Sequence, residues 1–183
     1  MFKLQKIDIC DFRAYLCNPQ FMNRSLELKI FTLATLKEQC VHWKHDHMQI
    51  VFTNGCFDIL HEGHVRYLTE AKSLGTKLIV GLNSDDSVKK LKGPNRPINN
   101  AKSRAIVLAG LESVDAVIVF EEETPHQLIA QLLPKVLVKG GDWKTEDIVG
   151  SDIVIEHGGK VYSLRFHEGY STTLIEQKIK NKS

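Results

Sequence analysis

The amino-acid sequence predicts a three-layer α/β/α fold built around a parallel sheet of about five strands. From residue 50 onward, short runs rich in β-branched residues alternate with segments of helical spacing. The runs are almost continuously apolar, as expected of strands that helices cover on both faces. Because strands that alternate with helices are joined by right-handed crossovers, the expected arrangement is Rossmann-like.

The individual elements follow from these patterns. The expected strands are IVFTN, TKLIVGL, DAVIVF, KVLVKG and KVYSLRF, and the expected helices cover residues 64–74, 101–113, 124–133, 146–156 and 171–180. In the third helix, Thr124 is expected to cap the first turn together with Gln127, and Pro134 follows the end. Residues 1–47 are expected to form an N-terminal extension with a packed helix over 31–47, and residues 48–183 to form the main domain.

Composition limits the possible functions. The 183 residues are 43% hydrophobic and 25% charged, with a formal net charge of +2, which is too balanced to indicate a nucleic-acid partner. No apolar run is long enough to cross a bilayer, and the first residues mix charge and apolar character too evenly for a secretory signal. The four cysteines form no CxxC pair, which favours free thiols over a zinc site; they are Cys10, Cys17, Cys40 and Cys56. We therefore expect a cytoplasmic protein with no nucleic-acid or membrane partner.

The most informative stretch is TNGCFDILHEGHVRYL, which follows the strand IVFTN and leads into a helix. A helix N-terminus offers unpaired N–H groups and a positive dipole end, both of which suit phosphate. His61 and His64 could donate hydrogen bonds there to phosphoryl oxygens, and Gly63 leaves room for a close approach. An isolated HxxH more often only flanks a helix, and the spacing differs from the i, i+4 pair of zinc proteases. The complete string, placed at a strand-to-helix turn, favours the phosphate site.

This string also carries a family resemblance. GCFDILHEGH resembles the GxFDxxHxGH motif of the cytidylyltransferase-like nucleotidyltransferases. Four further strings occur in the order found in adenylyltransferase domains that make nucleotide-activated heptose, namely VGLNSDDSVKKLKG, RPIN, LVKGGDW and EGYSTT. The resemblance implies transfer of AMP from ATP to a heptose 1-phosphate with release of pyrophosphate, for lipopolysaccharide or surface-glycan synthesis. It also implies Mg²⁺ on the triphosphate, a separate sugar kinase and a possible homodimer.

The resemblance assigns roles to individual residues. Catalytic roles fall to His61, His64 and Lys92. Besides the two histidines, the residues expected to bind the nucleotide are Thr53, Asn54, Gly55, Phe57, Gly63, Gly141, Asp142, Ser171, Thr172 and Thr173. The residues expected to bind phosphate or the acceptor are Asp58, Asn83, Lys92, Arg104 and Lys139.

Several of these residues have a plainer interpretation. The lysines of the polar segment 89–97, expected to be a loop, could be a solvated basic face, although Lys92 beside a glycine is the best phosphate candidate. Arg104 could instead form an ion pair with Asp85 or Asp86, and the segment with Asp142 could be only a turn. For the last helix, Ser171 and Thr172 are expected to contact phosphate, whereas Thr173 and Glu176 spell a capping box.

Three other functions compete. A cytidylyltransferase acting on glycerol 3-phosphate is the nearest alternative, although such relatives carry arginine where this chain has Phe166, two residues before Glu168. A non-catalytic nucleotide-binding module and an RNA-linked role are the others, and the latter is disfavoured by the weak basic charge. The histidines His42, His45 and His47 could bind a metal ion, but an exposed helix end is the preferred interpretation.

Overall fold

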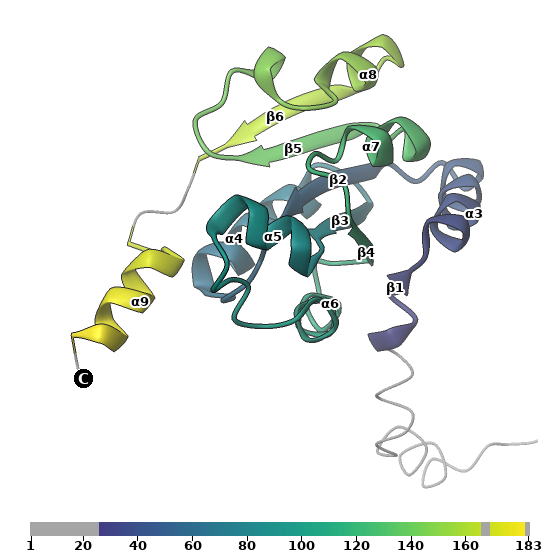
Figure 1. The fold of residues 1–183 in the computed structure, drawn as a ribbon. Coiled ribbons are helices and arrows are strands. Elements are labelled where there is room, and N and C mark those ends of the chain that lie inside the picture. The colour runs from purple at the N-terminus through teal and green to yellow at the C-terminus, as the bar shows by residue number, and fades with distance from the viewer. Residues whose placement is uncertain (1–25, 166–168, 182–183) are drawn as a thin grey trace, which may run out of the picture.

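The structure, a computed structural model, describes residues 26–165 and 169–181 (Figure 1). The predictions that concern Cys10, Cys17, Phe166 and Glu168 lie outside the described residues. Within them, six strands form one parallel sheet in the order β1-β4-β3-β2-β5-β6. The strands are β1 (Ile30–Phe31), β2 (Ile50–Gly55), β3 (Lys77–Asn83), β4 (Ala116–Phe120), β5 (Val136–Gly140) and β6 (Lys160–Leu164). The predicted three-layer fold is confirmed, and the strand beyond the expected five is the two-residue β1.

Helices cover both faces of this sheet. They are α3 (Leu33–His45), α4 (Glu62–Ser73), α5 (Asp85–Lys92), α6 (Ala101–Ala109), α7 (His126–Leu132), the 3₁₀ turn η1 (Thr145–Asp147), α8 (Ser151–Glu156) and α9 (Thr172–Lys180). None of the helices in the described ranges has both the length and the apolar character that a bilayer crossing requires.

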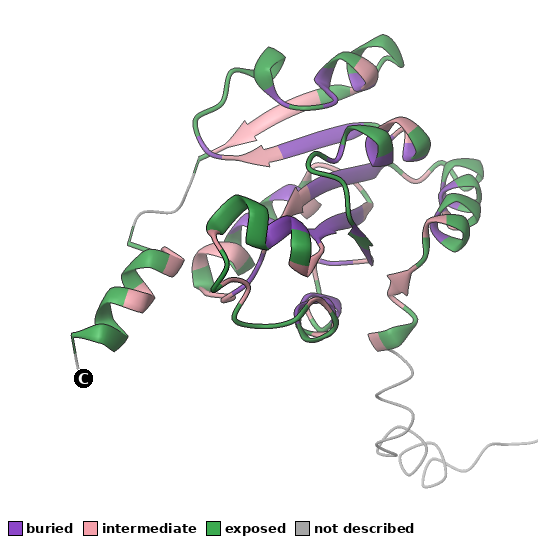
Figure 2. Cartoon of the chain, viewed as in Figure 1, coloured by how far each residue is buried: buried purple, intermediate pink, exposed green. Residues whose placement is uncertain are grey.

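The core lies in two layers because successive residues of a buried strand point to opposite faces. Phe52 of β2 packs in one cluster with Leu36 of α3 and Ile129 of α7, whereas Val51 packs in the other cluster with Leu68 of α4 and Leu108 of α6. Figure 2 shows the central strands as the most buried part of the molecule. Both β1 and α3 precede residue 48, yet they share this sheet and this core with the rest of the chain.

The polar segment after β3 is helical at its start, so the predicted loop is wrong over residues 89–92. Ser84 caps α5, its Oγ accepting a hydrogen bond from the Ser87 N–H at 3.2 Å. Acidic residues occupy the first turn and basic residues the last, which complements the helix dipole. Gly93 ends the helix with a φ of 99°, a conformation that glycine adopts without strain. The charges that suggested a loop are therefore ordered along a short helix.

Other helix boundaries also differ from prediction. Helix α7 begins at His126 with Pro125 as its N-cap and no side-chain cap, so Thr124 and Gln127 do not form the expected capping box. Helix α6 ends at Ala109 instead of residue 113. The segment 146–156 is split into η1 and α8, and Gly150 between them has a φ of 85°. Gly150 packs against Ile129, and a Cβ at this position would lie 2.7 Å from Ile129 Cδ1.

Candidate active site

A pocket of about 680 Å³ opens at the carboxyl ends of β2 and β5. From β2 the sheet grows outward through β3 and β4, and the chain then crosses back to place β5 on the other side of β2. Ligands of open parallel sheets bind at such a switch point. The pocket is lined by Asn54, Gly55, Cys56, Phe57, Asp58, His61, Gly63, His64, Tyr67, Lys92, Lys139, Gly140, Trp143, Gly169, Tyr170, Ser171, Thr172 and Leu174.

The turn after β2 is shaped by Phe57, which has a φ of 43°. Its ring lies against Gly55, where a Cβ would be 2.9 Å from Phe57 Cε2. The same ring contacts His64 edge-on, with centroids 5.3 Å apart. Gly55 is therefore needed for space, and the aromatic ring fixes the orientation of the imidazole beside it.

The two histidines come together in the pocket as predicted. His61 is the N-cap residue of α4, and its ring stacks on that of His64 with centroids 3.8 Å apart and an interplanar angle of 27°. The Nδ1 atoms of both rings are buried, and within the described structure neither has a hydrogen-bond partner. Buried polar atoms are normally paired, so two orphaned nitrogens in one pocket indicate a place for a ligand.

Gly63 lies between the histidines at the first turn of α4. A Cβ at this position would be 2.8 Å from Tyr170 Cβ and 3.1 Å from His61 Nδ1. The glycine therefore allows the segment before α9 to approach the N-terminus of α4 closely. Two helix N-termini, those of α4 and α9, thus border one pocket, and both favour anions.

Both imidazoles are neutral at pH 7. Burial, together with the neighbouring His61 and Lys92, lowers the pKa of His64 from 6.5 to about 4. Burial also lowers the pKa of His61. A neutral imidazole carries one N–H donor and one acceptor nitrogen, so each ring can donate one hydrogen bond to a phosphoryl oxygen.

The depressed pKa of His64 predicts a pH-dependent stability. The unfolded chain binds a proton near pH 6.5, whereas the folded protein does so only near pH 4. The stabilisation is therefore complete above about pH 6.5 and is lost as the pH falls toward about 4. Urea unfolding of the wild type and of His64→Gln at about pH 7.5 and pH 4.5 measures this contribution. The variant should lose less stability between the two pH values, and an equal loss in both proteins would contradict the prediction.

Two lysines add positive charge to the pocket. Lys92 is the last residue of α5, and Lys139 comes from β5. Lys139 Nζ donates a hydrogen bond to Asn54 Oδ1 at 3.2 Å, across the two neighbouring strands. Burial lowers the pKa of Lys139. Both lysines, which the sequence predicts to bind phosphate, line the pocket.

Helix α9 contributes hydroxyl groups, with one correction. Ser171 and Thr172 line the pocket as expected. However, Ser171 itself caps α9, because its Oγ accepts a hydrogen bond from the Leu174 N–H at 3.1 Å. The predicted capping box of Thr173 and Glu176 is wrong, since Glu176 instead contacts Arg96.

Asp58 lines the pocket, but its carboxylate is already engaged. It accepts hydrogen bonds from Arg96 Nη1 at 2.6 Å and from the backbone N–H groups of Ile98 and Asn99 at 2.8 and 3.0 Å. Its side chain is fully buried. Asp58 therefore joins the histidine loop to the loop between α5 and α6.

Arg104 forms an ion pair with Asp85, one of the two partners that the alternative interpretation named. Its Nη2 donates to Asp85 Oδ1 at 2.7 Å, its Nη1 to the Cys56 carbonyl at 2.6 Å, and its Nε to the Asn99 carbonyl at 2.9 Å. The side chain is 1% exposed and is not part of the pocket wall. Arg104 lies behind the histidine loop and supports it.

Two more predicted residues are buried behind the pocket. Thr53 shares a 2.6 Å hydrogen bond with the Tyr67 hydroxyl, which itself lines the pocket. Asn83 donates to Ser87 Oγ at 2.9 Å at the start of α5. Both side chains hold neighbouring elements together rather than facing the pocket.

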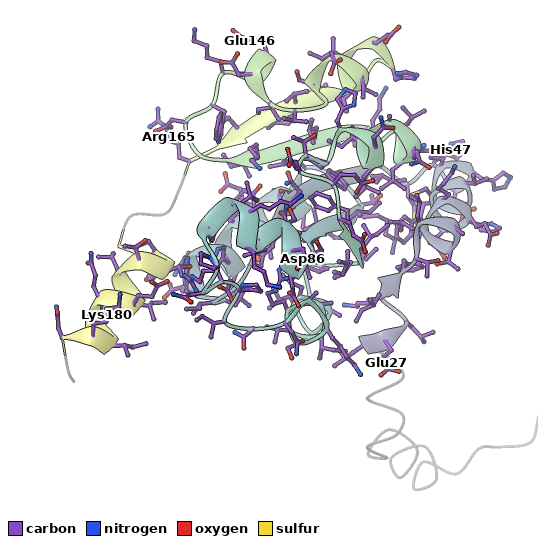
Figure 3. The ribbon with its side chains drawn as sticks, viewed as in Figure 1. Glu27, His47, Asp86, Glu146, Arg165 and Lys180 are labelled. Atoms are coloured by element: carbon purple, nitrogen blue, oxygen red, sulfur yellow. The ribbon has the colours of Figure 1, made fainter. Side chains whose placement is uncertain are left out.

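The segment after β5 contributes Trp143 to the pocket wall instead of the predicted Asp142. Asp142 is 90% exposed, lies outside the pocket wall and pairs with Arg165 at 4.0 Å. Arg165, labelled in Figure 3, follows β6. Gly141 has a φ of 121°, and its N–H donates to the Leu164 carbonyl at 2.8 Å. Trp143 lines the pocket instead, with its indole N–H held by the Gly140 carbonyl at 3.0 Å.

Sequence reasoning therefore missed part of the pocket wall, namely Cys56, Tyr67, Gly140, Trp143, Gly169, Tyr170 and Leu174. Trp143 and Tyr170 lie inside the strings that carry the resemblance, and an aromatic residue beside a glycine turn could have singled them out. Among the residues that the structure describes, no three His, Cys, Asp or Glu side chains gather as metal ligands. The histidines at 42, 45 and 47 are exposed around the end of α3.

Comparisons with known proteins agree with this geometry. Residues 52–178 match the cytidylyltransferase-like family. The chain is 54% identical over 151 residues to the bifunctional protein HldE of Haemophilus influenzae (strain PittEE), a match that covers 82% of this chain and 32% of that protein. HldE of Pasteurella multocida is 55% identical over 150 residues, with the same coverage. The chain thus spans about a third of the length of these curated relatives.

Two solved structures share the fold. The lipopolysaccharide core biosynthesis protein of Thermoplasma volcanium has a TM-score of 0.55 and 31% identity, covering 68% of this chain and 99% of that protein. Pantoate-β-alanine ligase of Francisella tularensis has a TM-score of 0.51 at 14% identity, covering 82% and 76%, and shows a likeness of fold alone. With its HxGH histidines stacked at the switch point and 127 consecutive residues matched, the chain belongs to the cytidylyltransferase-like family of nucleotidyltransferases.

Proposed function

We propose that this nucleotidyltransferase transfers AMP from ATP to a heptose 1-phosphate and releases pyrophosphate. The product would be a nucleotide-activated sugar for lipopolysaccharide or surface-glycan synthesis. The stacked pair of His61 and His64 carries the proposal, because both rings have unpartnered Nδ1 atoms in a pocket bordered by two helix N-termini. This environment suits a phosphoryl group whose negative charge grows during the reaction.

The proposed reaction is a direct displacement at the α-phosphorus. An oxygen of the sugar phosphate forms a new P–O bond as the bond to the β-phosphate oxygen breaks, and pyrophosphate leaves with that electron pair. Neutral His61 and His64 donate to α-phosphoryl oxygens, and Lys92 and Lys139 balance the remaining phosphate charge. Because the protein supplies no nucleophile, catalysis is positioning and charge stabilisation.

The N-terminus of α9 is proposed to bind the β- and γ-phosphates. Ser171 and Thr172 line the pocket opposite the histidine loop. Mg²⁺ would enter with the triphosphate and neutralise its oxygens. Among the described residues that line the pocket, Asp58 is the one that carries a carboxylate. Its oxygens already accept hydrogen bonds from Arg96 and from the N–H groups of Ile98 and Asn99. We therefore assign the metal to the nucleotide rather than to a set of protein ligands.

The relatives support the choice of acceptor and nucleotide. The chain is more than half identical to HldE proteins over most of its length, and the Thermoplasma structure is named for lipopolysaccharide core biosynthesis. The sequence strings resemble the domain that activates heptose with ATP. Trp143 and Gly140 border the pocket on the β5 side, where we propose that the adenosine lies.

A matrix of nucleotides and acceptors tests the proposal. We expect pyrophosphate release with ATP and heptose 1-phosphate to exceed that with CTP, GTP or glycerol 3-phosphate by roughly tenfold or more, because a site built for one ligand rejects others by lost contacts. Heptose 7-phosphate is the control for the position of the phosphate. Turnover that is highest with CTP and glycerol 3-phosphate would establish the cytidylyltransferase alternative. Tight ATP binding without product from any acceptor would indicate a non-catalytic module.

A further inference from the structure

Helix α9 is attached to the molecule by unusually few contacts. None of its residues is buried (Figure 2), in contrast to α4 and α6, which each bury several side chains. Even so, Ser171, Thr172 and Leu174 form part of the pocket wall. The position of this wall must therefore depend on specific polar contacts more than on apolar packing.

Arg96 makes such a contact. Its guanidinium donates through Nη1 to Asp58 Oδ2 at 2.6 Å and through Nη2 to Glu176 Oε1 of α9. The Arg96 side chain is 13% exposed and the Asp58 side chain fully buried, whereas Glu176 is 35% exposed. One cation thus joins the loop that carries the histidines to the helix that borders the opposite side of the pocket.

The chemistry of arginine suits this bridge. A guanidinium is planar, permanently charged and able to donate to two carboxylates at once, which an ammonium group does less precisely. Charge-assisted hydrogen bonds are about twice as strong as neutral ones, and partial burial protects this pair from the screening that weakens surface ion pairs. The Arg96–Asp58 bond is further fixed by the two N–H groups that also donate to Asp58.

We propose that Arg96 is a positioning residue that holds the N-terminus of α9 over the histidine pair through Glu176. The inference rests on the proposed function, since the ligand of α9 is taken to be the triphosphate of ATP. A second contact, the hydrogen bond between Tyr170 and Glu62, holds the residue just before α9. It does not reach Glu176, which is held by Arg96. Loss of the bridge would let the Ser171–Thr172 cradle move away from the phosphates while the histidines stay in place.

Replacing Glu176 separates positioning from folding. Glu176→Ala removes the α9 side of the bridge and leaves Asp58 paired with Arg96, so the interior keeps its charge balance. Glu176→Gln retains a hydrogen-bond acceptor without the charge. Gln177→Ala, at the exposed neighbouring position of the same helix, is the matched control.

Calorimetric titration with MgATP, in the absence of any acceptor, gives the first readout. We expect Glu176→Ala to bind ATP about tenfold more weakly, Glu176→Gln to recover part of that loss and Gln177→Ala to match the wild type. In turnover assays, KM for ATP should rise by a similar factor with kcat nearly unchanged, because the cradle holds the same phosphates before and during reaction. Hydrogen exchange should accelerate in α9 and stay unchanged in β2 and β3.

The outcomes distinguish this inference from the proposed function. A wild-type chain that binds no ATP would overturn both. Wild-type ATP binding that is retained in full by Glu176→Ala, with unchanged exchange in α9, would overturn the positioning role alone. A uniform loss of exchange protection throughout the sheet would also overturn it, because the bridge would then support the whole fold.

Discussion

His64→Ala should lower kcat by roughly 10²–10³, the usual cost of removing one well-placed donor from a site of developing charge. The His64 ring is stacked on His61 and held by Phe57, so its loss removes the donor and also loosens its neighbour. Affinity for ATP should change much less, since Lys92, Lys139 and the α9 cradle remain. Steady-state pyrophosphate release and ATP titration together measure the two effects.

The matched control is His157→Ala. This histidine is exposed at the end of α8, where its Nδ1 lies 2.8 Å from the Ile153 carbonyl, and it is not part of the pocket wall. It should retain wild-type turnover. Near-normal kcat in His64→Ala, with the fold confirmed by circular dichroism, would count decisively against a catalytic role for the pair.

Arg104→Ala should destabilise the protein by about 3 kcal/mol, because removing a buried guanidinium leaves several hydrogen-bond acceptors without their donor. Three acceptors would lose their donor at once, namely the carboxylate of Asp85 and the carbonyls of Cys56 and Asn99. Urea unfolding at neutral pH measures the loss.

Arg66→Ala is the matched comparison, because Arg66 also forms an ion pair but lies on the surface. Arg66 pairs with Glu62 one helical turn away at 2.6 Å, but both side chains are about half exposed. Solvent screens such an exposed pair, so Arg66→Ala should unfold at nearly the same urea concentration as the wild type. If Arg104→Ala kept full stability and lost ATP affinity instead, the phosphate-binding role implied by the family resemblance would be correct and the supporting role wrong.

Periodicity alone was sufficient for the central sheet, because β2 to β5 are short, apolar and bounded by turns. It was insufficient for α5, whose eight residues carry five charges and whose stability depends on the Ser84 cap and on packing of Val88. The two-residue strand β1 is too short to produce any period. Its place in the sheet depends on pairing with Val117 and Ile118, far away in the sequence.

The site was predictable where one local string fixes the geometry, as for His61 and His64. It was not predictable where burial decides the role. Asp58 and Arg104 have the chemistry of phosphate-site residues, but each is engaged by a distant part of the chain that only the folded structure brings close. Asp58 pairs with Arg96, 38 residues away, and Arg104 donates to the Cys56 carbonyl, 48 residues away. Trp143 reaches the pocket for a similar reason, since the left-handed turn at Gly141 directs the chain there.

The 3.8 Å stacking of the imidazoles couples the protonation of one ring to that of the other. A proton added to either ring would face its neighbour at contact distance, so the two rings cannot ionise independently. The acid limb of a pH–rate profile would then give an apparent pKa that belongs to the pair of rings. That apparent pKa should not be assigned to His61 or His64 alone.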